Sequence, residues 1–193
     1  MTDTAIDTER PLRADARRNR ERILESARAV FAEYGADAQI DDVAREAGVG
    51  VGTVYRHFPT KEALLVELLR EKFRMFALRA REALEQDGEP FAAVEDLLRG
   101  NAETMARDAA IQQALAGAGE HIWMQAETEL QELLAITGEL VARARRAGMI
   151  RQDLQATDIG MLMCGLCSTM GSQAPGFDWR RHLELIIDML RAR

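Results

Sequence analysis

Apolar residues recur along this chain with the spacing of helices. The clearest stripe follows i, i+4, i+7, i+8 and i+11, and consists of Ile23, Ala27, Val30, Phe31 and Tyr34. Such a stripe is one face of an amphipathic helix, and the glycine directly after it is a typical helix stop. No segment combines period-two alternation with β-branched residues, so the pattern predicts an all-α protein.

Three further helices are predicted in quick succession. The second is short and ends at Gly48, and the third, about two turns long, ends before Pro59. Thr60 is suited to cap a fourth helix, whose apolar pattern continues without glycine or proline as far as Gly88. We therefore expect one helix to leave the N-terminal helical domain and enter a second, C-terminal helical domain.

The remainder of the chain predicts four more segments. A fifth helix begins at Pro90, glycines 117 and 119 mark a break, and one long helix spans about residues 121–147. The last two helices carry stripes that are too apolar for the surface of a monomer, so we expect them to form a four-helix interface with a second copy. The side chains predicted for this interface are Leu162, Leu166, Met170, Trp179, Leu183, Ile187 and Leu190.

Charge is unevenly distributed along the chain. The net charge is −7, from 25 basic and 32 acidic residues, which taken as a whole argues against a nucleic-acid binder. Residues 10–61, however, carry a net charge of +2, whereas residues 62–193 carry −6. The basic excess is densest in Arg10, Arg13, Arg17, Arg18, Arg20 and Arg22. A solvated helix face would show the same run, so it does not identify a partner by itself.

The segment of residues 39–61 has the order of parts of a helix-turn-helix: a short helix, a glycine turn, a second short helix and a third helix start. Small residues at the start of the second helix, among them Gly52 and Thr53, let the backbone approach DNA closely. The free N–H groups at the start of the following helix suit a phosphate, and Lys61 adds a full charge there. The segment therefore predicts a double-stranded DNA partner.

This part of the chain strongly resembles the N-terminal domain of the tetracycline-repressor (TetR) family. The resemblance covers roughly residues 17–70 and rests on the pieces AREAGV, GTVYRHF and PTKEALL, preceded by FAEYG. It implies a repressor that binds a near-palindromic operator as a homodimer and is released by a small ligand in the C-terminal domain. The DNA contacts it implies are Arg45, Val51, Gly52, Thr53, Tyr55, His57 and Lys61.

With this resemblance the chain divides into three parts. Residues 1–12 are polar and aperiodic and predict a disordered tail. Residues 13–72 are the expected DNA-binding domain, with the helix-turn-helix at about 39–58, and residues 73–193 are the expected ligand-binding and dimerisation domain. The chain departs from the family where Ser or Thr is usual, at Gln39 and Gly50, which puts a helix cap and a hydroxyl contact in doubt.

Other kinds of site are not favoured by the sequence. Cys164 and Cys167 form a CxxC inside an apolar helical stripe, which indicates two buried hydrophobes rather than a redox or metal site. No catalytic motif is present, so we expect neither an enzyme nor a cofactor. An apolar small-molecule effector is the expected ligand, and the candidate pocket residues are Phe76, Met105, Trp123 and Met163.

Two alternatives stay open at this point. The same fold could serve an activator or global regulator without a ligand, and a small helical enzyme or scaffold could merely resemble a DNA binder. No apolar stretch is long enough to span a bilayer, and the N-terminus lacks a signal peptide. We therefore expect no membrane partner and a cytoplasmic location.

Overall fold

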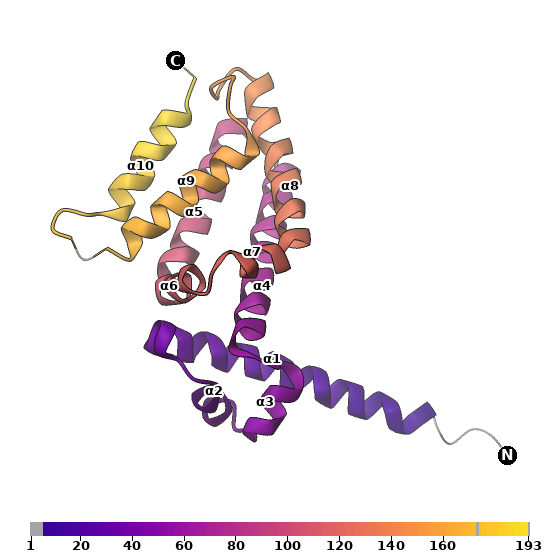
Figure 1. Cartoon of the computed structure of the whole chain (residues 1–193). Coiled ribbons are helices and arrows are strands. Elements are labelled where there is room, and N and C mark those ends of the chain that lie inside the picture. The colour runs from indigo at the N-terminus through magenta and orange to yellow at the C-terminus, as the bar shows by residue number, and fades with distance from the viewer. Residues whose placement is uncertain (1–5, 173, 193) are drawn as a thin grey trace.

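The computed structural model of the chain describes residues 6–172 and 174–192 (Figure 1). Within these residues the secondary structure is helical, and a single antiparallel bridge joins Ile150 to Arg191. The all-α prediction is confirmed. The elements are α1 (Ile6–Tyr34), a short 3-10 helix (Gly35–Asp37), α2 (Ile40–Glu46), α3 (Val51–His57), α4 (Lys61–Glu85), α5 (Pro90–Arg107), α6 (Ala109–Gly117), α7 (Glu120–Gln125), α8 (Glu127–Arg146), α9 (Ala156–Met170) and α10 (Trp179–Leu190).

The ends of the short helices follow from single residues. After α2, Gly48 adopts a φ of 62°, which only glycine reaches without strain. Its N–H donates to the carbonyl of Arg45 at 3.2 Å and the N–H of Val49 donates to that of Ala44 at 3.0 Å, which is a Schellman cap. At the start of α4 the Thr60 hydroxyl accepts from the N–H of Ala63 at 3.1 Å. Both predicted boundaries are confirmed.

The first helix is longer than its apolar stripe. It begins at Ile6 and includes residues 6–12, so the predicted disordered tail is wrong for these residues, while residues 1–5 lie outside the described residues. Polar, charged residues continue a helix readily when an apolar stripe further along anchors it. In Figure 1 the N-terminal part of α1 extends well beyond the body of the molecule.

Helix α4 connects two hydrophobic cores. The first core contains the buried side chains of α1, α2 and α3 together with the first half of α4, up to Phe73. The second core begins at Phe76 on the same helix and continues through α5, α8, α9 and α10. The predicted shared helix is therefore present, and the change of core falls close to the expected boundary at residue 72. Figure 1 shows α4 rising from the small N-terminal unit to lie beside α8.

Two helix breaks were not predicted. The expected long helix of residues 121–147 is divided at Ala126 into α7 and α8, and the expected helix that begins at Pro90 is divided at Asp108 into α5 and α6. The break at Ala126 is stabilised by Arg70, whose guanidinium donates to the carbonyl of Gln125 at 2.7 and 3.2 Å. Residues of α6 and α7, such as Ile111 and Ile122, pack into the first core, although the sequence placed them in the second domain.

The apolar stripes of the last two helices belong to the protein's own core. Leu166, Leu183, Ile187 and Leu190 are at most 4% exposed and pack in the second core. The prediction that these four form a dimer interface is therefore wrong, because a second copy cannot reach them. Leu162, Met170 and Trp179 are partly buried against the same core. Within the described residues, no helix is both long and apolar enough to cross a membrane.

Candidate nucleic-acid interface and ligand cavity

Helix α3 presents one face to the core and the other to solvent. Val54 is fully buried and Phe58, directly after the helix, is 3% exposed, so these two hold the helix in the first core, where it packs against α2. Val51 is 36% exposed and Tyr55 47% exposed on the outer face. The Tyr55 side chain is therefore accessible from the outer face of the helix. Thr53 is partly exposed, and the start of the helix is open around Gly52, where an added Cβ would meet nothing within 4 Å.

A surface depression of about 550 Å³ lies beside this outer face. It is bordered by the start of α2, by Tyr55 on α3 and by Thr60 and Lys61 at the start of α4. The first N–H groups of a helix carry partial positive charge, so the start of the long helix α4 suits a phosphate oxygen. Asp41 also borders the depression and opposes an anion. His57, at the end of α3, is partly buried beside Phe58.

Lys61 is less free than the sequence suggested. Its ammonium donates to the carbonyl of Ala36 at 2.5 Å and lies 5.6 Å from the centre of the Phe31 ring. These contacts hold the start of α4 against the end of α1. Lys61 nevertheless borders the depression, so its charge remains close to where a phosphate would lie.

Gln39 is the N-cap of α2 and forms a capping box with Asp42. Its N–H donates to the carboxylate of Asp42 at 3.3 Å, whereas its side-chain amide donates to the carbonyl of Asp37 at 2.8 Å. Gly50 begins α3 with no side chain at all. Arg45 on α2 is largely exposed and pairs with Asp42. The start of α2 therefore carries two carboxylates near the place where the family usually has a hydroxyl.

The arginines of α1 divide into two groups. Arg17, Arg18 and Arg22 are exposed along the helix. Arg20 instead turns inward, with its guanidinium 2.9 Å from Glu67 and 5.4 Å from the centre of the Phe58 ring. The side chains of Arg10 and Arg13 lie outside the described residues. Only part of the basic run therefore remains exposed and free to act on DNA.

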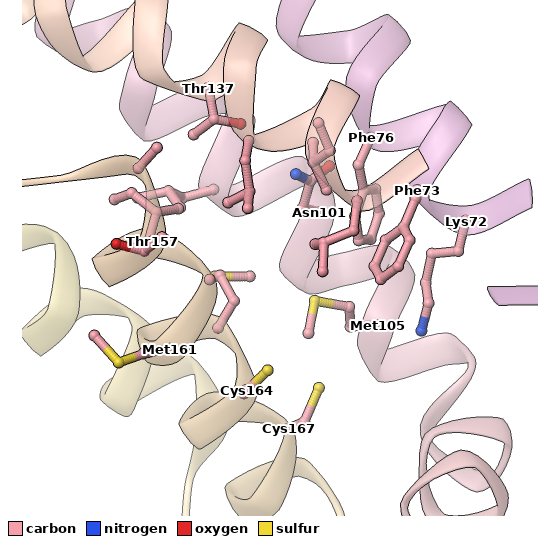
Figure 2. A pocket seen from close by; sticks show the side chains of 18 of the residues that line it. Lys72, Phe73, Phe76, Asn101, Met105, Thr137, Thr157, Met161, Cys164 and Cys167 are labelled. Carbon is pink, nitrogen blue, oxygen red and sulfur yellow. The ribbon is translucent and has the colours of Figure 1, made fainter. Parts of the chain in front are cut away.

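A cavity of about 560 Å³ lies in the C-terminal part of the molecule, between α4, α5, α8 and α9 (Figure 2). All four predicted pocket residues border it: Phe76, Met105, Trp123 and Met163. Most of the wall is aliphatic or aromatic, and Phe73 packs against Trp123 with ring centres 6.0 Å apart. Lys72 is the one cation in the described wall, which contains no carboxylate.

The two cysteines border this cavity from α9. Burial raises the pKa of the Cys164 thiol and raises that of Cys167 to about 11. A redox-active CxxC needs the opposite shift, because the thiolate is the reactive form. In the part of the chain that the structure describes, no group of three His, Cys, Asp or Glu side chains could hold a metal ion.

Comparison with known proteins finds a match for the N-terminal helix-turn-helix unit and another for the C-terminal helices that border the cavity. A family model described as bacterial regulatory proteins, tetR family, matches residues 23–68, and a model described as the C-terminal domain of SbtR-like transcriptional regulators matches residues 89–192. The chain belongs to the TetR family. This TetR-family protein is therefore a DNA-binding transcriptional regulator, and its helix-turn-helix consists of α2 and α3.

Relatives of this TetR-family protein match most of its length. A TetR regulatory protein from Mycobacterium vanbaalenii is 38% identical, and the match covers 94% of this chain and 100% of that one with a TM-score of 0.67. The repressor KstR of Mycolicibacterium smegmatis is 27% identical over 98% of this chain and 96% of its own. The Bacillus subtilis regulator FadR, solved with stearoyl-CoA, shares the fold at 22% identity over 88% of this chain and 98% of that one, with a TM-score of 0.71.

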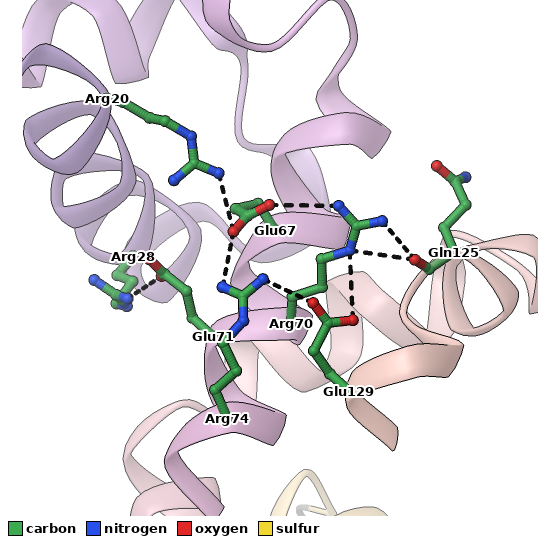
Figure 3. Close-up of polar contacts among 8 residues, drawn as sticks. All are labelled: Arg20, Arg28, Glu67, Arg70, Glu71, Arg74, Gln125 and Glu129. Carbon is green, nitrogen blue, oxygen red and sulfur yellow. Dashed lines mark hydrogen bonds and ion pairs between the residues drawn. The ribbon is translucent and has the colours of Figure 1, made fainter. Parts of the chain in front are cut away.

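An ion-pair network joins the DNA-binding unit of this TetR-family protein to its C-terminal helices (Figure 3). Glu67 on α4 is 7% exposed and receives Arg20 from α1 at 2.9 Å and Arg74 from its own helix at 3.1 Å. Arg74 also reaches Glu129 on α8 at 2.7 Å. Burial alone would raise the pKa of Glu67, but the hydrogen bonds and charges of the two arginines outweigh it and lower the pKa.

Sequence analysis did not identify Lys72 in the cavity wall or Glu67 in the ion-pair network as candidate functional residues. Lys72 is one of only two lysines in the chain and interrupts the apolar stripe of α4 directly before Phe73. Glu67 likewise falls between Val66 and Leu68 in an otherwise apolar run. A charge on the apolar face of a helix is the signal that could have marked both, because such a charge needs a partner or a function.

Proposed function

We propose that this protein is a ligand-responsive repressor that binds a near-palindromic operator as a homodimer and acts in the cytoplasm. The main support for this proposal is helix α4. Its first residue, Lys61, borders the depression beside α3, and its middle residues line the cavity. A molecule that fills the cavity therefore contacts the helix on which the DNA-reading unit is mounted. Repression itself is supported by the relationship to the repressor KstR.

The proposed effector is a small, largely apolar molecule. The cavity volume falls within the range of small-molecule sites, and its wall is mostly hydrocarbon. FadR, which shares the fold, holds stearoyl-CoA, and this supports an apolar effector for the present chain as well. Filling the cavity would displace the surrounding helices, which the Glu67 network links to α1.

The proposed dimer face is the outer side of α9 and α10. Met161 on α9 is 65% exposed, and Leu185 and Met189 on α10 are 51% and 45% exposed. Met161 and Met189 border one shallow depression together with Leu162, so the exposed side chains of the two helices form a common surface. Two such faces related by a two-fold axis would form a four-helix bundle.

Selection from a random double-stranded DNA library tests the proposed operator. We expect the enriched sequences to contain two inverted half-sites, and we expect Thr53→Ala to change the preferred bases more than it lowers the overall affinity, since Thr53 lies at the reading end of α3. Enrichment of no sequence, or of a single half-site, would contradict the proposal. A reporter under the selected operator separates repressor from activator by the sign of the change when the gene is deleted.

A further inference from the structure

Lys72 lies in the wall of the ligand cavity without an ion-pair partner. Among the described residues no carboxylate oxygen lies within 4.0 Å of its ammonium, and none borders the cavity. Figure 2 shows Lys72 on one side of the cavity and Thr157 on the other. A charge in apolar surroundings without a counter-ion is costly. The cost is visible in the pKa of Lys72, which burial lowers to about 8.

A second donor without an acceptor belongs to the same part of the wall. The side-chain nitrogen Nε2 of Gln112 is buried and has no hydrogen-bond partner in the described structure. The oxygen of the same amide lies 4.0 Å from the sulfur of Cys167, and the charge of Lys72 also acts on that thiol. Two donors that face one region of an apolar cavity both require an acceptor, and an anion with two oxygens would serve both.

The polar region lies next to an opening of the cavity. A neighbouring surface depression shares Gln112, Trp123, Cys164 and Cys167 with the cavity wall and continues to Ser168 and Ser172. The rest of the cavity wall is mostly apolar and includes the aliphatic side chains of Leu133, Leu134 and Ile159. A ligand with one polar end and one apolar end would therefore place its polar end near Lys72, close to solvent, and its tail in the aliphatic part.

We propose that the effector of this protein is a long-chain monocarboxylate, with its carboxylate on the ammonium of Lys72 and the amide of Gln112 and its hydrocarbon chain in the cavity. This inference rests on the proposed function, because it specifies the effector of the same cavity. A free carboxylate fits better than a coenzyme A thioester. The phosphates of coenzyme A require several cationic donors, whereas the described wall offers one cation.

The pH dependence of binding follows from the groups around Lys72. Cys164 and Cys167 face it from α9 and keep their protons well into the alkaline range, since burial raises the pKa of both thiols. Asp108, between α5 and α6, raises the pKa of Lys72 but remains farther than an ion pair. Free Lys72 therefore loses its charge as the pH rises through about 8. We expect affinity for a carboxylate to be constant from about pH 6, where the ligand is ionised, up to about pH 8, and to fall up to about tenfold per unit above it.

Calorimetric titration of the full chain with dodecanoate, below its micelle concentration, tests the inference. The controls are methyl dodecanoate, which keeps the tail and removes the charge, and Lys72→Met, which keeps the side-chain length and removes the ammonium. We expect dodecanoate to bind the wild type at least about tenfold more tightly than the ester. Lys72→Met should lose that preference and bind both molecules equally.

Several results of this titration would rule out a carboxylate effector. Equal affinity of the wild type for acid and ester, or an undiminished preference in Lys72→Met, would overturn the inference. The comparison of acid and ester on the wild type remains decisive if Lys72→Met does not fold. Preferential binding of dodecanoyl-CoA would also overturn it, in favour of the thioester. Operator binding is measured separately without ligand, so a protein that binds DNA but not dodecanoate would refute the inference and leave the DNA-binding function intact.

Discussion

Lys61 both binds the backbone near the end of α1 and borders the surface depression beside α3. Its ammonium is held by the Ala36 carbonyl and the Phe31 ring, which positions the start of α4 beside Tyr55. A lysine that binds a backbone carbonyl keeps its full charge, and the remaining hydrogens of the ammonium can still reach a phosphate. Its removal should therefore affect both DNA binding and folding.

The substitution Lys61→Met removes the charge and keeps most of the aliphatic side chain. We expect the slope of log affinity against log salt to decrease by about 1 per protomer, or about 2 for the proposed dimer, equally for all sequences, as for the loss of one phosphate contact in each half-site. We also expect a small decrease in Tm from the lost hydrogen bond. Fluorescence anisotropy at several salt concentrations measures the slope.

A matched control is Arg81→Ala, which removes an exposed cation from the same helix far along the chain from the DNA face. It should leave the salt slope unchanged. If Lys61→Met kept the wild-type slope while Tm decreased, Lys61 would be a structural residue only.

Glu67 is one of the residues that connect helix α4 to α1. Glu67 is the buried member of a network whose arginines, Arg20, Arg70 and Arg74, keep between 36% and 49% of their side-chain surface exposed. The arginines can therefore recover hydration if Glu67 is lost, which limits the cost. The carboxylate itself receives Arg20 at 2.9 Å, Arg74 at 3.1 Å and Arg70 at 3.6 Å, and a neutral side chain cannot replace its charge.

We expect Glu67→Gln to lower the free energy of unfolding by about 1–3 kcal/mol at pH 7. The folded-state pKa of Glu67 is below its ordinary value, so this contribution is complete above the ordinary pKa and is lost as the pH falls through the folded-state pKa. The difference between variant and wild type should therefore shrink in acid. Urea unfolding at pH 7 and in acid measures both quantities.

Glu71→Gln is the control for this change, because Glu71 pairs with the exposed Arg28 one helical turn further along. We expect it to cost less than about 1 kcal/mol. A loss of stability from Glu71→Gln as large as that from Glu67→Gln would show that burial of Glu67 has no special role.

The proposed assembly of two copies would depend on surface side chains rather than on the apolar stripes within the core. Leu183, Ile187 and Leu190 hold α10 against its own protomer, with Arg99 adding an ion pair to Glu184. The opposite side of α10 carries Leu185 and Met189, which are exposed on the protomer. Exposed apolar side chains next to one another are typical of an interface.

The double substitution Leu185→Glu and Met189→Glu should prevent dimerisation, because it places four carboxylates on one two-fold interface. We expect light scattering to give a monomer at micromolar concentration, with Tm decreased only slightly. Operator affinity should decrease strongly, since the two half-sites are then bound independently.

Leu78→Glu is the control for solubility and charge, because Leu78 is 53% exposed on α4, outside the proposed face. It should leave the dimer intact. A double variant that stayed dimeric would place the interface elsewhere on the protein.

The sequence determined the helices whose boundaries depend on single residues. Gly48, Thr60 and Pro90 end or begin helices by local geometry, and the motif of residues 39–61 placed α2, α3 and the start of α4 correctly. Local conformation and spacing are sufficient for this, because the responsible contacts lie within a few residues. The sequence also offered Phe76, Met105, Trp123 and Met163 as candidate pocket residues, and all four line one cavity, although they come from four different helices.

Which apolar stripe packs against the same chain and which remains exposed depends on tertiary contacts. Periodicity shows that Leu166 and Leu190 lie on apolar faces, but it does not show whether the neighbour is the same chain or a second copy. The break at Ala126 likewise depends on Arg70, which is distant in sequence. The roles of Lys72 and Glu67 could not be predicted from their neighbours in the sequence. The cost of a buried charge depends on the partners that other helices bring to it.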